Sequence, residues 1–358
     1  MNKLTSEAKK GISIRVITAV FIALYLVLAF VFASFSSPLG QHGEGWVKFL
    51  PTDKPYITLI FAILFILSFA WLSYFIAKEL CIAFLKTNKP SMVITITIIL
   101  LVIQLTPTIC YLPYVYYPDS YLFDSWWQLI LIYACTSIGT ALIAYGFLYK
   151  AIKHAPKSTK FNIVMFPLVV IGIAWSFSLI YYLTINHEWS SILIILIGVC
   201  ACDIFAFFGG SLFGKHKLAP NVSPKKTWEG AIIGSVIAAM FVVLFVYLIG
   251  IGDSNHRYLF FGVQTGALLS ENAGWWILIV VMAIVLVVSA VLGDLLFSLI
   301  KRKTNIKDFG TILPGHGGLL DRMDSFLFTF FTFGGITIFI SLIASIVHKQ
   351  DCVFPFIG

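Results

Sequence analysis

Charged residues are scarce in this chain. Asp, Glu, Lys and Arg make up 11% of its 358 residues, whereas hydrophobic residues make up 59%. Soluble domains carry about 25% charged residues, so this composition excludes an ordinary soluble fold. Apolar runs that cross a bilayer account for the length of the chain instead. We therefore predict an all-α, polytopic integral membrane protein.

The chain also lacks the cysteine spacing of a metal site or a disulfide framework. Its six cysteines are scattered, mostly within apolar runs, and no two are spaced as CxxC. This pattern indicates neither a zinc site nor disulfides. It favours cysteines that serve as small apolar side chains in packing.

Nine apolar runs are long enough to span a membrane. They cover residues 16–35, 56–76, 92–112, 126–149, 162–184, 190–210, 230–250, 275–300 and 326–347. If each run crosses once, all but four of the 24 Lys and Arg residues fall in the N-terminal tail or in loops on its side. Cytoplasmic loops carry an excess of Lys and Arg, so the N-terminus is predicted to be cytoplasmic. The first run is too long for a signal-peptide core and is expected to stay as an anchor.

The first five runs contain no Asp, Glu, Lys or Arg, whereas later runs contain acids. Asp203 lies within the sixth run, and Asp294 lies near the inner end of the eighth. An ionisable side chain inside a span is costly to bury without a partner and therefore indicates function. For Asp203, the alternative is a structural carboxylate paired with a lysine or with a helix end. We predict an N-terminal membrane region at 1–189 and a catalytic membrane region at 190–358. The catalytic region has cytoplasmic loops at 211–229 and 301–325.

The loop after the sixth run is rich in cations. Gly209–Lys215 fits the phosphate-loop pattern G-x-x-x-x-G-K only superficially. His216 follows where that motif requires Ser or Thr, and a membrane helix precedes it where the motif requires a strand. Ser223, Lys225 and Lys226 can still bind phosphate through a hydroxyl group and positive charge. A basic loop on the cytoplasmic side accounts for the lysines but not for the whole sequence Ser-Pro-Lys-Lys-Thr-Trp-Glu-Gly.

The segment between the eighth and ninth runs holds the densest group of side chains able to bind metal and phosphate. Asp294, Ser298 and Lys301 are spaced i, i+4 and i+7, so one helix face presents an acid, a hydroxyl and a base. Asp321 and Asp324 open the ninth run at i and i+3, on a common face. The segment also contains Arg302, Lys307, His316, Gly317, Gly318 and Arg322. Helix capping explains one acid alone, but the combination is typical of a site for a polyphosphate carried with a divalent cation.

These residues resemble the signature of the phosphatidate cytidylyltransferase (CDP-diacylglycerol synthase) family, S-x-x-K-R-x4-K-D-x-G-x2-L-P-x-H-G-G-x-x-D-R-x-D. Every defined position is filled at the right spacing between Ser298 and Asp324. An upstream block, from Asp203 to Gly230, is similar to a second segment of the family. Together the two blocks cover roughly residues 190–326, and the first five runs match only as generic membrane helices.

Two positions depart from the family pattern. Phe297 stands where the family often has Glu, and Phe207 stands where it often has Tyr. Both changes remove polar groups, so neither position is assigned to the site.

The resemblance implies transfer of a cytidylyl group from CTP to phosphatidate, giving CDP-diacylglycerol and pyrophosphate. The phosphate of phosphatidate is already an anionic nucleophile, so a strong general base is not required. The difficulty is to bring two polyanions together and to stabilise charge on the leaving pyrophosphate. Metal ions and cationic side chains provide both effects.

The resemblance also implies roles for individual residues. The implied catalytic residues are Asp294, Lys301, Arg302, His316, Asp321 and Arg322. The implied substrate-binding residues are Ser223, Lys225, Lys226, Ser298, Lys307, Gly317 and Gly318. The implied metal ligands are Asp294 and Asp321, supported by Asp324 and Asp203. The expected cofactor is Mg²⁺, with a second metal ion left open.

The expected partners are CTP, phosphatidate and membrane lipids, without nucleic acid, and a homodimer is left open. The expected location is a bacterial plasma membrane, with the active site on its cytoplasmic side. Two alternatives remain. One is a secondary transporter, although transporters commonly have repeated halves and here the acids lie only in later runs. The other is a different CTP-dependent lipid enzyme, such as a polyprenol kinase or a CDP-archaeol synthase.

Overall fold

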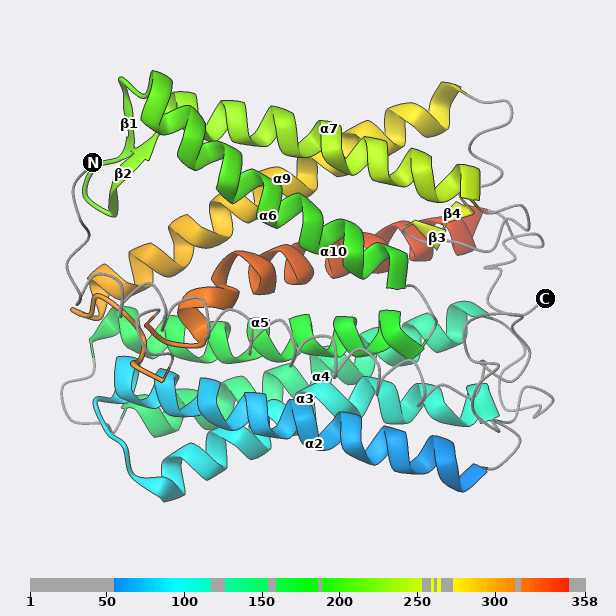
Figure 1. The fold of residues 1–358 in the computed structure, drawn as a ribbon. Coiled ribbons are helices and arrows are strands. Elements are labelled where there is room, and N and C mark those ends of the chain that lie inside the picture. The colour runs from blue at the N-terminus through cyan, green and yellow to red at the C-terminus, as the bar shows by residue number, and fades with distance from the viewer. Residues whose placement is uncertain are drawn as a thin grey trace. The chain divides into compact units, whose positions relative to one another are not determined.

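A computed structural model describes residues 55–116, 126–153, 159–185, 189–252, 259–260, 263–264, 273–312 and 317–347. Within them the chain forms eight long helices (Figure 1): α2 (Pro55–Leu80), α3 (Pro90–Tyr116), α4 (Trp126–Lys153), α5 (Lys160–Ile185), α6 (Trp189–Phe213), α7 (Trp228–Gly252), α9 (Ala273–Lys303) and α10 (Leu320–Val347). A short π-helix, η3 (Cys81–Leu85), extends α2. The predicted all-α membrane class is confirmed. The first predicted run, 16–35, lies outside the described residues, so the count of nine spans stays a prediction.

The helices are apolar enough to lie in a bilayer. Among the described residues, six helices contain a stretch suited to cross a membrane by length and composition, and α3 contains a shorter apolar stretch. A chain in hydrocarbon must satisfy its backbone hydrogen bonds within each segment, which explains why these apolar sequences are helical. Large apolar side chains such as Ile143, Leu212 and Met240 are exposed on the helices. Such apolar surfaces suit contact with lipid.

Packing divides the chain into two compact units. The described residues of unit 1 fall within Met1–Val102, Ile143–Val170 and Lys301–Met323. Those of unit 2 fall within Ile103–Leu142, Ile171–Ile300 and Asp324–Gly358. The predicted boundary at residue 190 separates runs without acids from runs with acids. Packing does not test that criterion, and the boundary stays a prediction.

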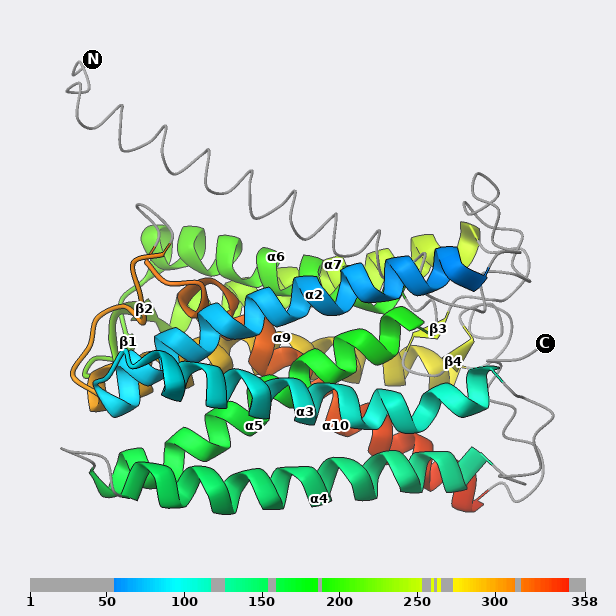
Figure 2. The same ribbon diagram turned by 90° about the horizontal axis from the view of Figure 1, so that it is seen from below.

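Four helices share the core of unit 2. Its buried side chains include Val199 on α6, Val242 on α7, Leu286 on α9 and Phe330 on α10. Figures 1 and 2 both show α6 lying beside α7. This core supports the parts of α6, α7 and α9 that carry the polar residues of the unit.

Glycines allow α6 and α7 to approach closely. A Cβ atom added at Gly234 would lie 2.6 Å from the backbone nitrogen of Ala206, and one added at Gly230 would lie 2.6 Å from the carbonyl oxygen of Ala206. Small residues at helix crossings bring backbones together in membrane proteins. The close contact therefore requires glycine, which has no side chain, at positions 230 and 234.

We expect Gly234→Ala to destabilise the protein by about 1–3 kcal/mol, the usual effect of forcing an extra group into a well-packed interior. Thermal unfolding of the purified protein in detergent measures the change. Gly146→Ala on α4 is the matched control, because a Cβ atom there would meet nothing within 4 Å and alanine is the better helix former. Equal stability of the two variants would contradict the tight α6–α7 contact.

A β-hairpin joins α6 to α7. Strand β1 (Lys217–Ala219) pairs antiparallel with β2 (Ser223–Thr227), and Ala219 lies opposite Ser223. The sequence predicts a loop here, because strands this short and this rich in lysine show no apolar alternation. A second, smaller pair is formed by β3 (Leu259–Phe260) and β4 (Val263–Gln264).

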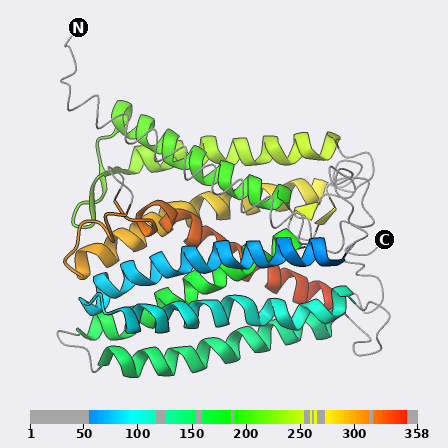
Figure 3. The same ribbon diagram turned by 60° about the horizontal axis from the view of Figure 1, so that its bottom comes forward.

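The segment between α9 and α10 is shorter than the predicted loop at 301–325. Helix α9 continues to Lys303 before the chain turns (Figure 3), and α10 begins at Leu320. Basic side chains are favourable in the last turn of a helix, so α9 does not end at its first lysine. We call the described residues between these helices, 304–312 and 317–319, the α9–α10 linker.

Candidate functional site

The predicted site residues fall into two groups, one in each packing unit. The group in unit 1 is built from the α9–α10 linker and the helix ends next to it. The group in unit 2 is built from α6, the β1–β2 hairpin, α9 and α10. Each group is described by itself.

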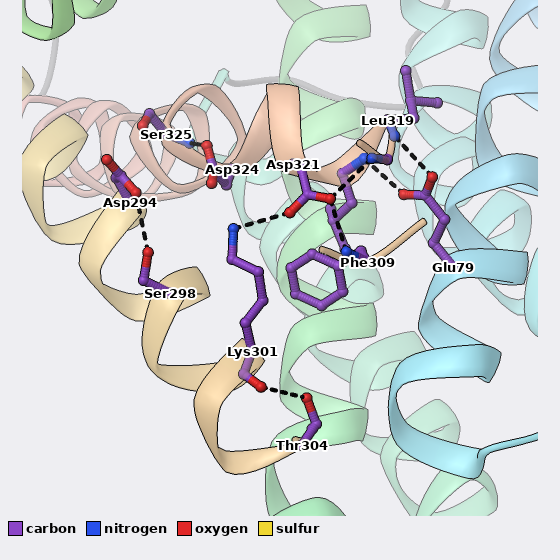
Figure 4. A network of polar contacts seen from close by, with 12 residues as sticks. Glu79, Asp294, Ser298, Lys301, Thr304, Phe309, Leu319, Asp321, Asp324 and Ser325 are labelled. Carbon is purple, nitrogen blue, oxygen red and sulfur yellow. Dashed lines mark hydrogen bonds and ion pairs between the residues drawn. The ribbon is translucent and has the colours of Figure 1, made fainter. Parts of the chain in front are cut away.

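Asp321 is the centre of the polar contacts in unit 1 (Figure 4). Its Oδ1 atom accepts a hydrogen bond from Lys301 Nζ at 2.9 Å. Its Oδ2 atom accepts two more, from the backbone N–H groups of Phe309 at 2.7 Å and Gly318 at 3.0 Å. The Asp321 side chain is 6% exposed and that of Lys301 is 13% exposed. A carboxylate has about four lone-pair positions, so three donors leave room for a further ligand.

The α9–α10 linker is shaped around this carboxylate. Gly317 has φ of +84°, which side chains rarely allow, and a Cβ atom there would lie 3.3 Å from Asp321 Oδ2. The turn at Gly317 presents the next amide, that of Gly318, to Asp321. Lys301 Nζ also lies 5.5 Å from the centre of the buried Phe309 ring, within the range of a cation–π contact. The chain thus holds Lys301 and Asp321 from several sides.

Glu79 is a polar residue of this group that the sequence did not predict. The predicted second run ended at residue 76, but α2 continues to Leu80, and the candidate span Ile66–Leu85 contains this acid. The expectation that the first five spans contain no charge is therefore wrong for the helix as it forms. Glu79 is fully buried and accepts hydrogen bonds from the backbone N–H groups of Leu319 and Leu320, both at 2.8 Å.

Leu319 and Leu320 stand at the start of α10, where backbone N–H groups have no partner within the helix. Glu79 satisfies two of these groups from a helix some 240 residues away in the sequence. The only signal in the sequence was a single acid among lysines, just after an apolar run. Such a position is read as an ordinary cytoplasmic loop unless its partner is known.

In unit 2, the hairpin brings a predicted phosphate-binding cation to a predicted metal ligand. Lys226 from β2 forms an ion pair with Asp294 Oδ2 on α9. The Ser298 hydroxyl donates to Asp294 Oδ1 at 3.3 Å. Asp203 on α6 is close enough to interact electrostatically with both Asp294 and Lys226. The side chains of Lys226 and Asp294 are 28% and 26% exposed, so a ligand can reach them.

Polar contacts at the base of the hairpin set its position. Glu229, in the first turn of α7, accepts hydrogen bonds from the backbone N–H groups of Lys215 at 3.1 Å and His216 at 3.2 Å. The His216 ring Nδ1 lies 2.6 Å from Glu229 Oε1. Thr227 Oγ1 accepts from the backbone N–H of Gly230, as an N-cap residue does. Lys226 is therefore carried on an anchored strand.

The remaining predicted residues are placed as follows. Asp324 is buried, and its Oδ1 accepts a hydrogen bond from the backbone N–H of Ser325 at 2.8 Å (Figure 4). It lies beside the close α9–α10 contact at Gly293, where a Cβ atom would be 2.7 Å from the Cβ of Phe328. Four of the predicted cations are exposed: Arg302, Lys307, Arg322 and Lys225. The predicted hydroxyl residue Ser223 is partly buried. His316 lies outside the described residues.

The two departures from the family pattern differ in environment. Phe297 is buried, whereas Phe207 is 72% exposed on α6. Phe297 therefore contributes to the interior, and Phe207 contributes to the apolar surface.

The carboxylates of unit 2 fit a magnesium ion that is bound together with a nucleotide. Within the described residues no group of three or more His, Cys, Asp or Glu side chains could hold a metal ion. Mg²⁺ usually binds to one or two carboxylates and to substrate phosphates, keeping several waters. Asp203 and Asp294 supply two acids near each other, and a cation between them would relieve their repulsion. The donor set fits Mg²⁺ in this form, without a cage made only of protein.

Comparisons with known proteins point in one direction. A family model described as "Cytidylyltransferase family" matches residues 12–340. The phosphatidate cytidylyltransferase of Rickettsia typhi is 34% identical over 207 residues, which cover 56% of this chain and 79% of that protein. The protein of the same name from Rickettsia prowazekii is 38% identical over 182 residues, 50% of this chain and 72% of its own. That from Haemophilus influenzae is 37% identical over 142 residues, 39% of this chain and 42% of its own.

Proposed function

Because the chain belongs to the cytidylyltransferase family, we propose that it transfers the cytidylyl group of CTP to phosphatidate, giving CDP-diacylglycerol and pyrophosphate. The observation that carries the proposal is the complete signature from Ser298 to Asp324, in a chain whose relatives are named phosphatidate cytidylyltransferase. The contact between Lys226 and Asp294 supports it, since it joins the upstream block to the residue that accepts a hydrogen bond from Ser298, the first residue of the signature.

In the proposed reaction, a phosphate oxygen of phosphatidate forms a bond to the α-phosphorus of CTP. The bond from that phosphorus to the oxygen bridging it to the β-phosphorus breaks, and pyrophosphate leaves with the electron pair. Lys226 and Lys225 attract the triphosphate, and Lys301, Arg302 and Arg322 bind phosphate oxygens. Cations placed where negative charge develops stabilise the transition state. Because the nucleophile is already anionic, no side chain needs to remove a proton from it.

The proposed cofactor is Mg²⁺, which when bound neutralises phosphate charge and orients the phosphates. Asp294 and Asp203 would hold it in unit 2, and Asp321 and Asp324 are the other proposed ligands. Asp321 already accepts three hydrogen bonds. Through these hydrogen bonds, Asp321 holds Lys301 and the α9–α10 linker in place.

The protein is an integral membrane protein, and its relatives include bacterial enzymes. We propose the bacterial plasma membrane as its location, with the site on the cytoplasmic side. The distribution of Lys and Arg supports this side. A nucleotide then arrives from the cytosol while lipid tails hold the other substrate in the bilayer. A homodimer stays a prediction.

The hairpin lysines provide a test of the nucleotide site. We expect Lys226→Met to lower kcat/KM for CTP by about 10- to 100-fold, since each 1.4 kcal/mol of lost interaction is tenfold. Lys225→Met is the matched control on the same strand, and it should have the smaller effect because Lys225 is exposed and Lys226 is paired with Asp294. Steady-state kinetics with varied CTP measure both. A larger loss for Lys225→Met would contradict the placement.

The experiment that tests the function is CTP turnover by the purified protein in micelles with phosphatidate and magnesium. Release of pyrophosphate that depends on phosphatidate supports the proposal. Release of CDP on a polyprenol would identify a kinase instead, and turnover only on an ether-linked archaeal lipid would identify a CDP-archaeol synthase. If no lipid supports turnover while proteoliposomes take up a solute without nucleotide, the transporter becomes the leading account.

A further inference from the structure

Glu79 accepts hydrogen bonds from backbone N–H groups at the start of α10. It also contacts the first stretch of the α9–α10 linker, residues 304–312. A Cβ atom added at Gly310 would lie 2.5 Å from Glu79 Oε1, and one added at Gly318 would lie 2.7 Å from the same oxygen. The hydrogen bonds from Leu319 and Leu320 occupy the two oxygens of the carboxylate. One buried acid therefore contacts both described stretches of the linker. Glycine at 310 and 318 lets the backbone reach it.

Lys86 contacts the same linker at its beginning. Its Nζ donates to the carbonyl oxygen of Thr304 at 2.6 Å, just after the last turn of α9. Carbonyl groups at a helix C-terminus lack partners within the helix and are stabilised by cations. Glu79 and Lys86 come from one continuous piece of chain, the end of α2 and η3. This piece of chain thus holds both ends of the linker. Lys86 binds a carbonyl group at its beginning, and Glu79 binds backbone N–H groups at its end.

The piece of chain is itself fixed to unit 1. Asn162 Nδ2 on α5 donates to the carbonyl oxygen of Phe84 at 3.4 Å, and the Phe84 and Phe166 rings lie 5.4 Å apart. Phe84 and Phe166 are both buried. π-Helical turns such as η3 are rare in proteins, and those that occur are often found at functional sites. The anchoring gives Glu79 and Lys86 a rigid support.

The geometry of the Lys301–Asp321 pair depends on the position of the α9–α10 linker. Asp321 is the residue after Leu320, and two of its three donors, the amides of Phe309 and Gly318, belong to the linker. The residue that follows each of these donors, Gly310 after Phe309 and Leu319 after Gly318, contacts Glu79. A shift of the linker away from Glu79 would therefore withdraw both amides from Asp321.

We propose that Glu79, assisted by Lys86, is a positioning residue that sets the geometry of the phosphate-handling pair Lys301–Asp321 by holding the α9–α10 linker against the end of α2. The kinetic part of this inference rests on the proposed function, whereas the structural part does not. Glu79 touches no substrate and acts through Asp321.

Glu79→Gln tests the proposal at constant side-chain size. The amide has one acceptor oxygen, so a donor NH₂ group must face the backbone N–H of Leu319 or Leu320. We expect kcat/KM for CTP to fall by on the order of 10- to 100-fold, as small misplacements of catalytic groups typically cause. We also expect kcat to fall and KM for CTP to rise together. A variant that merely left fewer molecules folded would lower the apparent kcat and leave KM unchanged.

Hydrogen exchange gives a readout that does not depend on activity. In the Glu79→Gln protein the amides of Phe309, Gly318, Leu319 and Leu320 should exchange faster than in wild type. Ser73→Ala, which alters another buried polar residue of α2, is the control and should leave these amides and the kinetics as in wild type. Wild-type exchange or wild-type KM and kcat in Glu79→Gln would overturn the proposal.

Two further variants keep the test decisive. Glu79→Asp retains the charge but shortens the side chain, so we expect a loss of kcat/KM for CTP between wild type and Glu79→Gln. If neither Glu79→Gln nor Glu79→Asp folds, Glu79 serves stability and the positioning role is overturned. Lys86→Met should have the same signature with a smaller effect, since Lys86 is exposed. If wild type itself does not turn over CTP on phosphatidate, the proposed function fails, and exchange alone decides whether Glu79 holds the linker.

Discussion

Asp321→Asn is expected to lower kcat by on the order of 10³-fold, the effect of removing a group that organises charge stabilisation. Asp321 receives the ammonium group of Lys301 on one oxygen and two backbone N–H groups on the other. An asparagine has only one acceptor oxygen, so its NH₂ group faces a donor whichever way it is turned. The same change removes the charge that pairs with the largely buried Lys301.

The loss of activity in Asp321→Asn should come with a loss of stability. Breaking a buried charge pair by removing one partner costs about 3–5 kcal/mol, and the free energy of unfolding should fall by an amount of this order. Pyrophosphate release and thermal unfolding in detergent measure the two effects. Asp253→Asn is the control, since that acid lies between the seventh and eighth predicted runs, outside both groups of predicted site residues. Turnover of Asp321→Asn within tenfold of wild type would contradict the central place of this carboxylate.

Asp294→Asn is expected to lower kcat by about 10²- to 10³-fold with little change in stability. The Asp294 side chain is 26% exposed, and its pair with Lys226 is open to solvent, where such pairs contribute about 0–1 kcal/mol. Removing its charge also ends the repulsion with Asp203. The free energy of unfolding should therefore change by no more than about 1 kcal/mol.

Magnesium dependence distinguishes Asp294 from Asp321. If Asp294 holds Mg²⁺, its asparagine variant should require more magnesium for half-maximal turnover, because one carboxylate ligand of two is lost. Pyrophosphate release across a magnesium titration, with thermal unfolding of the same samples, measures this. An unchanged magnesium dependence would remove Asp294 from the proposed ligands. A strong loss of stability would show that its role is structural.

Much of the candidate site could be predicted from local sequence. Asp294, Ser298 and Lys301 were expected on one face of a helix, and α9 runs unbroken through all three. Asp321 and Asp324 were expected to open the ninth run on a common face, and both lie near the start of α10, which begins at Leu320. These predictions succeed because helical periodicity depends only on spacing along the chain.

Other parts of the site could not be predicted in this way. Glu79 lies among loop lysines in the sequence, and its partners Leu319 and Leu320 are apolar residues whose backbone, not side chains, makes the contact. The Lys226–Asp294 pair joins a hairpin to a helix, and a strand of lysines gives no periodic signal. Backbone partners and contacts between distant segments leave no mark on composition or spacing.

The amino-acid sequence by itself determined the class of this protein and the residues that we propose for its chemistry. Scarce charge and long apolar runs require membrane helices, because unpaired polar groups are costly in hydrocarbon, and the spacing from Ser298 to Asp324 matches one family. Only the tertiary structure decided that Glu79 supports the start of α10 and that Lys226 reaches Asp294. These contacts depend on how closely helices and linker pack, as at Gly310 and Gly318, and packing is set by the shapes of segments far apart in the chain.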